Sequence, residues 1–407
     1  MNPLHEIEEL VAFEGRGPGT DAERRAAMHL GDRLRELGRQ VHVEPIRVRP
    51  NYPVVHLLHA LLAIVGSVVS VSSPVVGLAL VGLAFVSTVG DLTGSLTLGR
   101  FLTGARASQN VVSREEGGKP GTLVLVAHYD AARTGAVFAA RALARRARIG
   151  KLIRRPIGPF EPFVYAMLVV LVCAGLRVIG IEAFALTVVQ FIPTVALIVS
   201  VPLLADIALS SVVPGATDNA SGVATVLRLA DDFTDELEHF DLWVLLTGAE
   251  EGLLLGMRRF LRAHKKELDK RTTVFVGIDK VGGGTVRYAV KEGLVLAYRF
   301  HPSLIELCEE IAGEDGTGEN RYGARRLVSR QASDAHAARA AGYPAISISC
   351  LNAMDYAPDY HQPTDTPERV DPEALERGYE FCADLIESID ERIGPRLSAA
   401  HDAAAEG

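Results

Sequence analysis

Apolar positions along the chain form two long blocks, the first of them near the N-terminus. Residues 54–90 contain no Asp, Glu, Lys or Arg, and a Ser-Ser-Pro sequence at 72–74 divides the block into spans of roughly 54–72 and 75–92. Each span is close to the ~20 apolar residues that a helix needs to cross a bilayer. The first block therefore predicts a hairpin of two transmembrane helices.

The second apolar block runs from 163 to 209 and is interrupted between 177 and 182 by Arg, Gly and Glu. The interruption leaves spans of roughly 162–179 and 184–205, which again have transmembrane length. The alternative is that all four spans are core helices. An enzyme of this size would then have to bury two paired blocks of unusual length and purity. We therefore expect two transmembrane hairpins.

Basic residues mark one side of these hairpins. Arg47 and Arg49 precede the first hairpin, the run RALARRARIGKLIRRP at 141–156 precedes the second, and Arg177 is the one positive residue at either tip. Positive residues concentrate on the cytoplasmic side, so we expect a multi-pass protein of the inner (plasma) membrane with its polar part in the cytoplasm. Residues 1–50 lack the features of a secretory signal and are expected to stay there too. The basic run is interpreted as a membrane-flanking cluster, with contact to anionic lipid headgroups as the alternative.

Outside the hairpins, short apolar runs alternate with amphipathic segments. This alternation predicts strands that alternate with helices, and hence a mostly parallel sheet covered by helices. The fold class we expect is α/β, a three-layer sandwich with a central mixed, mostly parallel sheet flanked by helices, plus the two inserted hairpins. The predicted strands are 39–48, 122–130, 240–251, 272–279 and 344–350, and the predicted helices are 21–38, 221–233, 252–264, 302–313 and 372–393.

This organisation predicts six consecutive segments. The α/β domain begins at the N-terminus, is interrupted by each hairpin in turn, and is followed by a short tail that we expect to be flexible. The segments are 1–50, the first hairpin at 51–95, the next part of the domain at 96–158, the second hairpin at 159–210, the remainder of the domain at 211–395, and the tail at 396–407.

The remaining composition argues against two kinds of protein. The net charge of −8 does not suggest a nucleic-acid partner. The four cysteines are widely spaced with no CxxC pair, so they predict neither a disulfide framework nor a thiolate metal site.

Acidic and histidine residues gather where the predicted strands end. His128, the pair Glu250–Glu251 and Asp279 each follow an apolar run. In α/β sheets the carboxyl edge formed by such strand ends is where ligands bind. Asp218 in GATDNASG and His361 in DYHQPTDT lie in loops punctuated by Gly or Pro, where functional residues are common.

Five of these residues form a ligand set for metal ions. His128, Asp218, Glu251, Asp279 and His361 offer two imidazoles and three carboxylates. Nitrogen and oxygen ligands in this ratio suit a pair of divalent ions, with zinc favoured, although Co and Mn accept the same set. The sequence therefore predicts two metal ions, with zinc as the expected cofactor.

Two further residues have expected supporting roles. Asp130 lies two positions after His128, so both side chains point the same way and Asp130 can accept the second ring N–H of that histidine. Glu250 and Glu251 are adjacent acids at the end of a buried strand, where they repel each other and resist desolvation. A cation relieves this cost for Glu251 and leaves Glu250 as a general base.

Each motif taken singly also has a simpler explanation. A His near an Asp is a frequent coincidence, Asp218 suits an N-cap or Asx turn, and a Glu pair suits a helix N-terminus. Their joint occurrence favours the metal site. Around it, Asp365 or Thr366 is expected to orient the His361 ring. Lys280 is expected either to pair with a carboxylate or to be solvated, and His336 is interpreted as an ordinary surface or loop histidine.

On these motifs, the chain resembles the co-catalytic zinc aminopeptidases of peptidase family M28. The resemblance covers the polar part from the HYD strand onward, in family order, and implies a zinc-exopeptidase fold with a mixed central sheet. The matching segments are HYD at 128–130, TDNASGV at 217–223, AEEGLLLG at 249–256, GID at 277–279, SDAHAARAAGYPA at 333–345 and DYAPDYHQPTDTP at 355–367.

The resemblance implies a role for each candidate residue around two metals. These roles are bridging for Asp218, ligation of one metal for His128 and Asp279, ligation of the other for Glu251 and His361, general base for Glu250, and orientation of His128 for Asp130. The resemblance also implies a cis peptide bond between Asp218 and Asn219.

Three features depart from the family pattern. The hairpins are inserted before the HYD strand and between that strand and TDNASG. Lys280 stands where an apolar residue, often Met, follows the ligand aspartate, and the SDAH motif has no aromatic residue shortly after it. We expect these departures to affect substrate choice more than the reaction, since all the proposed ligand and general-base positions of the family are present.

The function we expect is that of a membrane-anchored di-zinc aminopeptidase. It would hydrolyse the N-terminal peptide bond of a peptide substrate, using a water shared by the two metals and Glu250 as base. One alternative is an acyltransferase of the glutaminyl-cyclase type, whose members resemble this family but use one zinc. The other alternative is a membrane scaffold with an inactive peptidase domain, which the intact ligand set disfavours.

Overall fold

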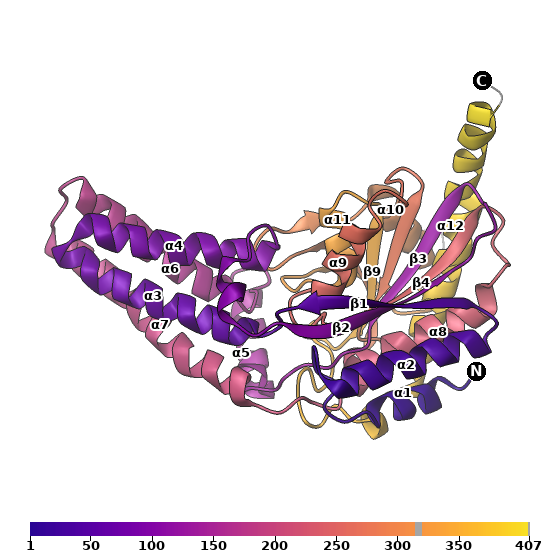
Figure 1. The fold of residues 1–407 in the computed structure, drawn as a ribbon, viewed down its shortest axis with the longest axis horizontal. Helices are drawn as coiled ribbons and strands as arrows, with labels where there is room; N and C mark the ends of the chain where they lie inside the picture. The colour runs from indigo at the N-terminus through magenta and orange to yellow at the C-terminus, as the bar shows by residue number, and fades with distance from the viewer. Residues whose placement is uncertain (314–319, 406–407) are drawn as a thin grey trace.

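The chain folds into an α/β domain from which a bundle of four long helices projects (Figure 1). This computed structural model describes residues 1–313 and 320–405, with side chains up to residue 397. The α/β domain contains a mixed sheet with helices on both faces, which confirms the predicted fold class.

The strands of the described residues form one nine-stranded sheet in the order β1-β2-β4-β3-β5-β9-β6-β7, with β8 beside β6. The central strands β4, β3, β5 and β9 are parallel, whereas β1, β2, β6 and β7 join the sheet through antiparallel pairs. Parallel pairing is thus concentrated in the centre of the sheet. The strands are β1 (Gln40–Val48), β2 (Arg106–Arg114), β3 (Gly121–His128), β4 (Phe240–Thr247), β5 (Thr273–Ile278), β6 (Thr285–Glu292), β7 (Tyr298–Arg299), β8 (Arg325–Val328) and β9 (Ala345–Leu351).

The first hairpin explains why β1 and β2 are antiparallel. They pair along their full length, from Gln40 opposite Arg114 to Val48 opposite Arg106. The chain leaves β1, passes through the hairpin and returns beside its starting point, so the two strands run in opposite directions. Both ends of the hairpin consequently connect to the same end of the sheet.

Helices cover both faces of the sheet. The helices α8 (Ser221–Phe233) and α12 (Pro372–Ala405) pack on one face, and α11 (Asp334–Ala340), with α9 (Leu255–Ala263) beside it, packs on the other. The remaining α-helices among the described residues of the domain are α1 (Pro3–Val11), α2 (Asp21–Glu36), α5 (Ala140–Leu152) and α10 (Pro302–Ile311). Helix α12 extends through 396–405, where a tail was expected, while residues 406 and 407 of that tail lie outside the described residues.

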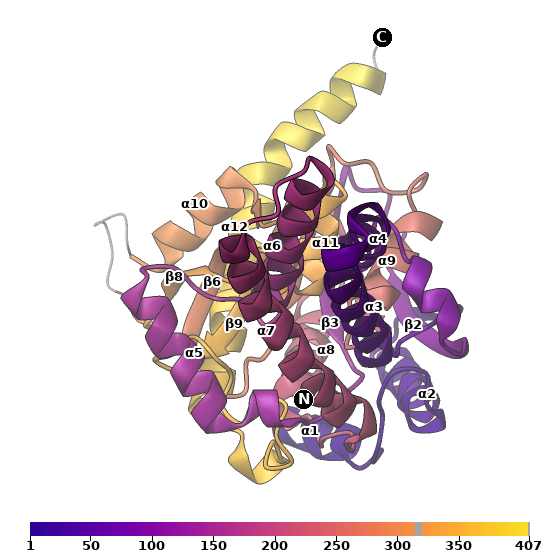
Figure 2. The same cartoon turned by 90° about the vertical axis from the view of Figure 1, so that its left-hand side faces the viewer.

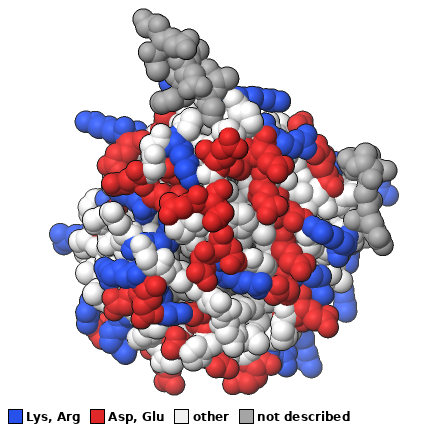
Figure 3. All heavy atoms as spheres, turned by 90° about the vertical axis from the view of Figure 1, so that its right-hand side faces the viewer, with Lys and Arg blue, Asp and Glu red and all other residues white. Residues whose placement is uncertain are grey.

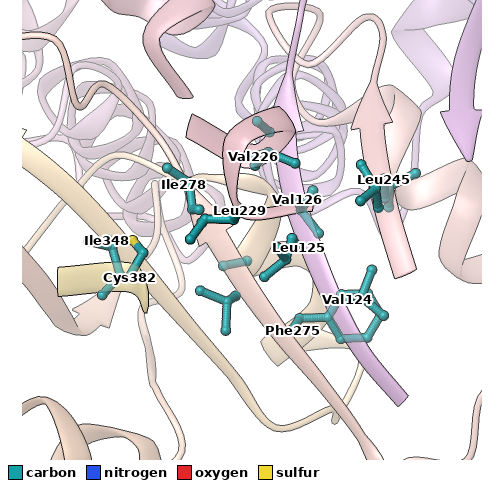
Figure 4. Close-up of a cluster of buried hydrophobic side chains, with 14 of the residues drawn as sticks. Val124, Leu125, Val126, Val226, Leu229, Leu245, Phe275, Ile278, Ile348 and Cys382 are labelled. Atoms are coloured by element: carbon teal, nitrogen blue, oxygen red, sulfur yellow. The ribbon is translucent and has the colours of Figure 1, made fainter. Parts of the chain in front are cut away.

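The main core lies between the central strands and the helices α8 and α12. Leu125 of β3, Phe275 of β5 and Ile348 of β9 are fully buried and belong to the same cluster as Leu229 of α8 and Cys382 of α12 (Figure 4). Burying one such aliphatic or aromatic side chain stabilises the fold by ~1.5–3 kcal/mol. The continuous apolar strands seen in the sequence are therefore those that are covered on both faces.

The two apolar blocks form the projecting bundle (Figure 2). The helices are α3 (Tyr52–Ser72), α4 (Pro74–Thr93), α6 (Glu161–Val178) and α7 (Phe184–Leu209). All four are long and apolar enough to cross a membrane. Many large apolar side chains face outward, among them Val68, Phe191 and Ile192, which are 65%, 65% and 69% exposed. Such a surface suits lipid rather than water.

Small and polar residues hold the bundle together. At Gly77 of α4, an added Cβ would lie 2.4 Å from the Cα of Ser70, so the two helices of the first hairpin touch through their backbones. The side-chain amide of Gln190 on α7 donates to the Ser67 carbonyl at 2.7 Å and to the Ser70 hydroxyl at 2.9 Å. Close approach at small residues and hydrogen bonds between helices are typical of packing in lipid.

The bundle is also joined to the α/β domain by charged side chains. Arg258 of α9 donates to the carbonyls of Asp91 and Leu92 at 3.4 and 3.2 Å. Arg100, just beyond the hairpin, donates to the Asp91 carboxylate at 2.6 Å. These contacts fix the end of α4 against the helix that follows the Glu250–Glu251 loop.

Candidate metal centre

The carboxyl edge of the central sheet brings three of the predicted site segments together. His128 is the last residue of β3 and pairs with Thr247, the last residue of β4. The Glu250–Glu251 loop follows β4, and Asp279 follows β5, which is parallel to β3. Adjacent parallel strands end at the same edge, so these side chains converge as expected.

Two loops complete the cluster at this edge. Asp218 lies in the short segment before α8, and His361 lies in the loop between β9 and α12. The five predicted ligands form two compact groups that share Asp218. One group contains Asp218, His128 and Asp279, and the other contains Asp218, Glu251 and His361.

The distances place Asp218 in the middle of this cluster. Its Oδ1 lies 3.3 Å from Nε2 of His128, and its Oδ2 lies 3.3 Å from Nε2 of His361. Nε2 of His128 is also 3.5 Å from Oδ1 of Asp279, and Nε2 of His361 is 3.3 Å from Oε1 of Glu251. Each carboxylate oxygen of Asp218 therefore faces one imidazole and one further carboxylate.

The residues fit a pair of cations. Asp218 is only 2% exposed, and neither of its carboxylate oxygens has a hydrogen-bond partner in the described residues. Oδ1 of Asp279 also lacks one. Buried carboxylates are normally hydrogen-bonded or paired, because burying an isolated charge costs several kcal/mol. Bound cations would satisfy these oxygens, and the N/O donor set suits zinc.

The electrostatics of the cluster follow from its excess of acids. Burial opposes ionisation of Asp218, but Lys280, His128 and His361 hold the pKa of Asp218 well below its usual range. Burial also opposes charging of His361, yet Glu251 and Asp218 raise the pKa of this histidine to about 9. The cluster therefore attracts positive charge, whether it is a proton or a metal ion.

Glu250 lies beside the two groups rather than within either of the ligand triads that share Asp218. Its Oε2 is 3.9 Å from Nε2 of His128, and its side chain is 12% exposed. Burial raises the pKa of Glu250 well above its usual range; His128 opposes this rise, and the nearby charges of Glu251 and Asp334 add to it. A carboxyl group with a raised pKa can take up a proton near neutral pH, which a general base requires.

Asp130 has a different hydrogen-bond role from the one we expected. Its carboxylate accepts the backbone N–H groups of Glu250 and Glu251, each at 3.0 Å. Nδ1 of His128 is closer to the Asp130 backbone carbonyl, at 3.1 Å, than to the carboxylate, at 3.6 Å. Asp130 thus contacts both His128 and the glutamate pair, and its carboxylate mainly positions that pair.

Neither Asp365 nor Thr366 has the role that we expected. The Asp365 carboxylate accepts the backbone N–H groups of Thr217 and Asp218 at 2.8 and 3.1 Å. Nδ1 of His361 has no hydrogen-bond partner among the described residues. The prediction that Asp365 or Thr366 orients the His361 ring was therefore wrong, because Asp365 turns toward the free N–H groups of the Asp218 loop.

The Asp218 loop is held from two further sides. The peptide bond between Asp218 and Asn219 is cis, which confirms that expectation. Oδ1 of Asn219 accepts the backbone N–H groups of Gly222 and Lys280 at 3.1 and 2.9 Å. At Gly222 an added Cβ would lie 2.2 Å from Oδ1 of Asn219, so the glycine of the TDNASG motif allows α8 to pack here.

Two charged residues that the sequence patterns did not indicate support the same loops. Arg16 is 1% exposed and donates to the carbonyls of Tyr129 and Gly215 at 2.9 and 2.7 Å. Glu23 is fully buried and accepts the backbone N–H of Ala249, which precedes the glutamate pair, at 2.8 Å. These contacts join residues more than 100 positions apart along the chain, so no local pattern indicates them.

Lys280 and the SDAH motif complete the surroundings. Lys280 forms a buried ion pair with Asp279, which decides between the two roles expected for it. Asp334 accepts a hydrogen bond from the Thr247 hydroxyl at 2.5 Å behind the site. His336 lies within α11 and is 9% exposed, so its interpretation as a surface or loop histidine was wrong. The three residues before it, Ser333, Asp334 and Ala335, are too polar to predict that this helix is buried.

Part of the chain matches a known peptidase family. Residues 200–386 match the model of peptidase family M28. Over 70 residues the chain is 39% identical to the vacuolar membrane protease of Schizosaccharomyces pombe. That match spans 17% of this chain and 8% of the vacuolar protein.

Several solved structures share the fold. The chain is similar to a Zn-dependent exopeptidase from Parabacteroides distasonis, with a TM-score of 0.53 and 14% identity over 96% of this chain and 97% of the other. It is similar to a leucine aminopeptidase precursor from Bacteroides thetaiotaomicron, with a TM-score of 0.52 and 13% identity over 94% and 95%. It is also similar to a glutaminyl cyclase from Porphyromonas gingivalis, with a TM-score of 0.54 and 13% identity over 95% and 96%. These likenesses show a common architecture.

Proposed function

We propose that this chain, whose catalytic region belongs to peptidase family M28, is a membrane-anchored aminopeptidase that works with two divalent metal ions, with zinc favoured. The observation that carries the proposal is the position of Asp218. Among the described residues neither of its buried oxygens has a hydrogen-bond partner, and each faces a separate group of one histidine and one further carboxylate. Two metal sites that share one carboxylate explain this arrangement.

The ligands divide between the two sites as follows. His128 and Asp279 would hold one ion, Glu251 and His361 would hold the other, and Asp218, which belongs to both groups, would serve both ions. Bound zinc in such a pair lowers the pKa of water and polarises the scissile carbonyl group. The Nδ1 atom of His128 donates to the Asp130 carbonyl, which leaves Nε2 free as the ligand atom.

Glu250 is proposed to move the proton. It lies at the side of both groups, within 3.9 Å of Nε2 of His128, and its pKa is already raised by burial. It accepts a proton from the attacking water and returns that proton to the leaving amine. Asp130 positions Glu250 through the backbone rather than taking part in proton transfer.

The comparisons support a substrate with a free N-terminus. The chain is similar in fold to a leucine aminopeptidase precursor, and residues 200–386 match the model of peptidase family M28. On this basis we take the reaction to be release of the N-terminal residue of a peptide.

The proposed membrane orientation rests on charge asymmetry. The basic run forms α5 (Ala140–Leu152), which lies next to the root of the bundle (Figure 2). The face of the α/β domain away from the bundle carries many Asp and Glu side chains (Figure 3). A basic side toward the membrane and an acidic side away from it suit a catalytic domain at the cytoplasmic face of the inner membrane.

The test is metal analysis combined with hydrolysis of a panel of aminoacyl substrates by the full chain in detergent. We expect two zinc ions per chain, release of the N-terminal residue, loss of activity with chelator, and recovery with zinc. One zinc per chain with cyclisation of N-terminal glutamine would instead support a glutaminyl-cyclase-like acyltransferase. No reaction across the panel with metal loaded would support an inactive scaffold.

A further inference from the structure

A cavity of about 180 Å³ opens beside the metal centre. Asp218, Glu250, Glu251 and His361 line one part of it. The other walls are mainly apolar and include Leu253 and Leu254, which follow the glutamate pair, and Leu294. A group bound at the proposed metals thus has an apolar space next to it.

Much of this apolar wall comes from the membrane-spanning helices. Leu203, Leu204 and Ile207 of α7 line the cavity, together with Phe163 of α6 and the preceding Phe160. The first hairpin contributes Tyr52, whose ring lies 5.9 Å from that of Phe160. The inserted hairpins are therefore part of the site and not only a tether.

The cavity lies at the end of the bundle nearest the catalytic domain. Helix α7 has 26 residues, more than the ~20 that cross a bilayer, and the lining residues 203–207 fall in its last two turns. Arg146 of the basic helix α5 also lines the cavity. These positions place the apolar wall at the bilayer surface.

Specific contacts connect α7 to the metal centre. Asp206 accepts the backbone N–H of Ala136 at 2.6 Å, at the start of the short helical turn η2 (Ala136–Phe138). The ring of Phe138 packs against His361 with their centres 4.5 Å apart, and the Phe138 carbonyl accepts the side-chain amide of Gln362 at 2.6 Å. The position of α7 is thereby set relative to a proposed metal ligand.

We propose that the second hairpin forms the specificity pocket, and that the enzyme prefers peptides whose N-terminal residue has a large apolar side chain such as Leu or Phe. The inference rests on the proposed aminopeptidase function, and it names the substrate class. With the α-amino group and the first carbonyl at the metal centre, the first side chain enters the space lined by α6 and α7.

The size and chemistry of the cavity match such a side chain. A cavity of ~150 Å³ lined by Leu, Ile and Phe is large enough to hold benzene. The present cavity is slightly larger, and Leu, Ile and Phe line its apolar part, while the residues of the metal centre line the rest. Adding or removing one methylene group in an apolar pocket changes kcat/KM by roughly 10–200-fold. A Leu substrate should accordingly exceed an Ala substrate by at least about 10-fold.

The test compares α7 variants of the full chain in lipid nanodiscs, using Leu-, Phe- and Ala-peptides. Leu203 is the chosen pocket residue, since it lines the cavity and is only partly buried. Leu203→Trp fills the space, Leu203→Ala enlarges it, and Ser200→Leu narrows it from a second lining position. The matched controls are Ile198→Trp and Leu209→Ala, at outward positions that are 51% and 86% exposed.

We expect Leu203→Trp and Ser200→Leu to lower the Leu-to-Ala ratio of kcat/KM by at least about 10-fold, and Leu203→Ala to raise the Phe-to-Leu ratio. The two controls should leave both ratios within about 2-fold of wild type, and zinc content identifies any variant that has not folded. A wild-type preference for charged or small first residues overturns the inference, as do unchanged ratios in folded pocket variants. Loss of all hydrolysis in the wild type refutes the proposed function instead.

Discussion

The carboxylate of Asp130 accepts a 3.0 Å hydrogen bond from the backbone N–H of Glu250. Its second oxygen accepts the N–H of Glu251 at the same distance. Asp130 is fully buried at the end of β3, whereas the glutamates follow β4, so this contact ties together two neighbouring strand ends. The proposed base and the adjacent ligand are therefore held by one carboxylate.

The first prediction concerns this contact. Asp130→Ala removes both acceptors and leaves two backbone N–H groups without partners, so we expect kcat to fall by ~10–100-fold, as is typical when a residue that orients metal ligands is lost. Asp130→Asn keeps one acceptor oxygen and should retain intermediate activity. The measurement is steady-state kinetics with zinc content determined in parallel. Wild-type kcat in a folded Asp130→Ala variant would contradict the positioning role.

The second prediction separates the proposed base from the proposed bridge. Glu250→Gln has almost the same shape but cannot take up a proton, so we expect metal content to be retained and kcat to fall by ~10²–10⁴-fold. Asp218→Ala removes the carboxylate shared by both groups, and we expect it to lose bound metal as well as activity. Metal analysis and kinetics of both variants check the prediction. An active Glu250→Gln enzyme would exclude Glu250 as the base.

The third prediction concerns the first hairpin. Gly77→Ala places a Cβ within 2.4 Å of the Ser70 backbone, which cannot move aside without separating α3 from α4. Overpacking of this kind typically costs ~1–3 kcal/mol. We expect a lower midpoint of thermal unfolding in detergent.

The control for this change is Gly82→Ala on the same helix. Its added Cβ meets only Leu171 at 3.7 Å, an ordinary contact, and alanine is the better helix former by ~1 kcal/mol. This variant should be as stable as the wild type or slightly more stable. Equal stability of the two variants would show that α3 and α4 do not pack as closely as the structure indicates.

The fourth prediction is a pH dependence of stability away from the metal centre. His264, at the end of α9, lies 3.0 Å from Glu44 of β1 and 2.9 Å from Glu267, with Arg114 also in contact. The hydrogen bond with Glu44 is the main cause that raises the pKa of His264 above its ordinary value; burial opposes the rise, and Glu267 adds to it.

The raised pKa of His264 determines how its contribution to stability changes with pH. A histidine with a raised pKa in the folded state stabilises the fold fully below its unfolded pKa of ~6.5, and this contribution is lost as the pH rises through the folded value. His264→Gln should therefore lower the unfolding midpoint more at pH 6 than at pH 9. Thermal unfolding of both proteins at the two pH values measures this difference. A larger effect at the higher pH would contradict the assignment.

Local patterns in the sequence indicated the apolar helices, the central strands and the chemistry of this protein. Apolar runs of bilayer length formed α3, α4, α6 and α7 because such helices satisfy their backbone hydrogen bonds internally. Apolar strands that end in polar residues placed His128, Asp279 and the glutamate pair at one sheet edge, since parallel neighbours end together. Length, hydrophobicity and strand direction are local properties, so they can be read along the chain.

Only the tertiary structure decided how distant side chains pair. Arg16, Glu23 and Asp365 support the site through partners more than 100 positions away, and no local pattern indicates these pairings. Asp130 turned toward the glutamate loop, and α7 supplied a wall of the cavity, because packing brings together segments that are far apart in sequence. A hydrogen-bond donor or an apolar side chain takes the partner that folding places beside it, and that choice is made in three dimensions.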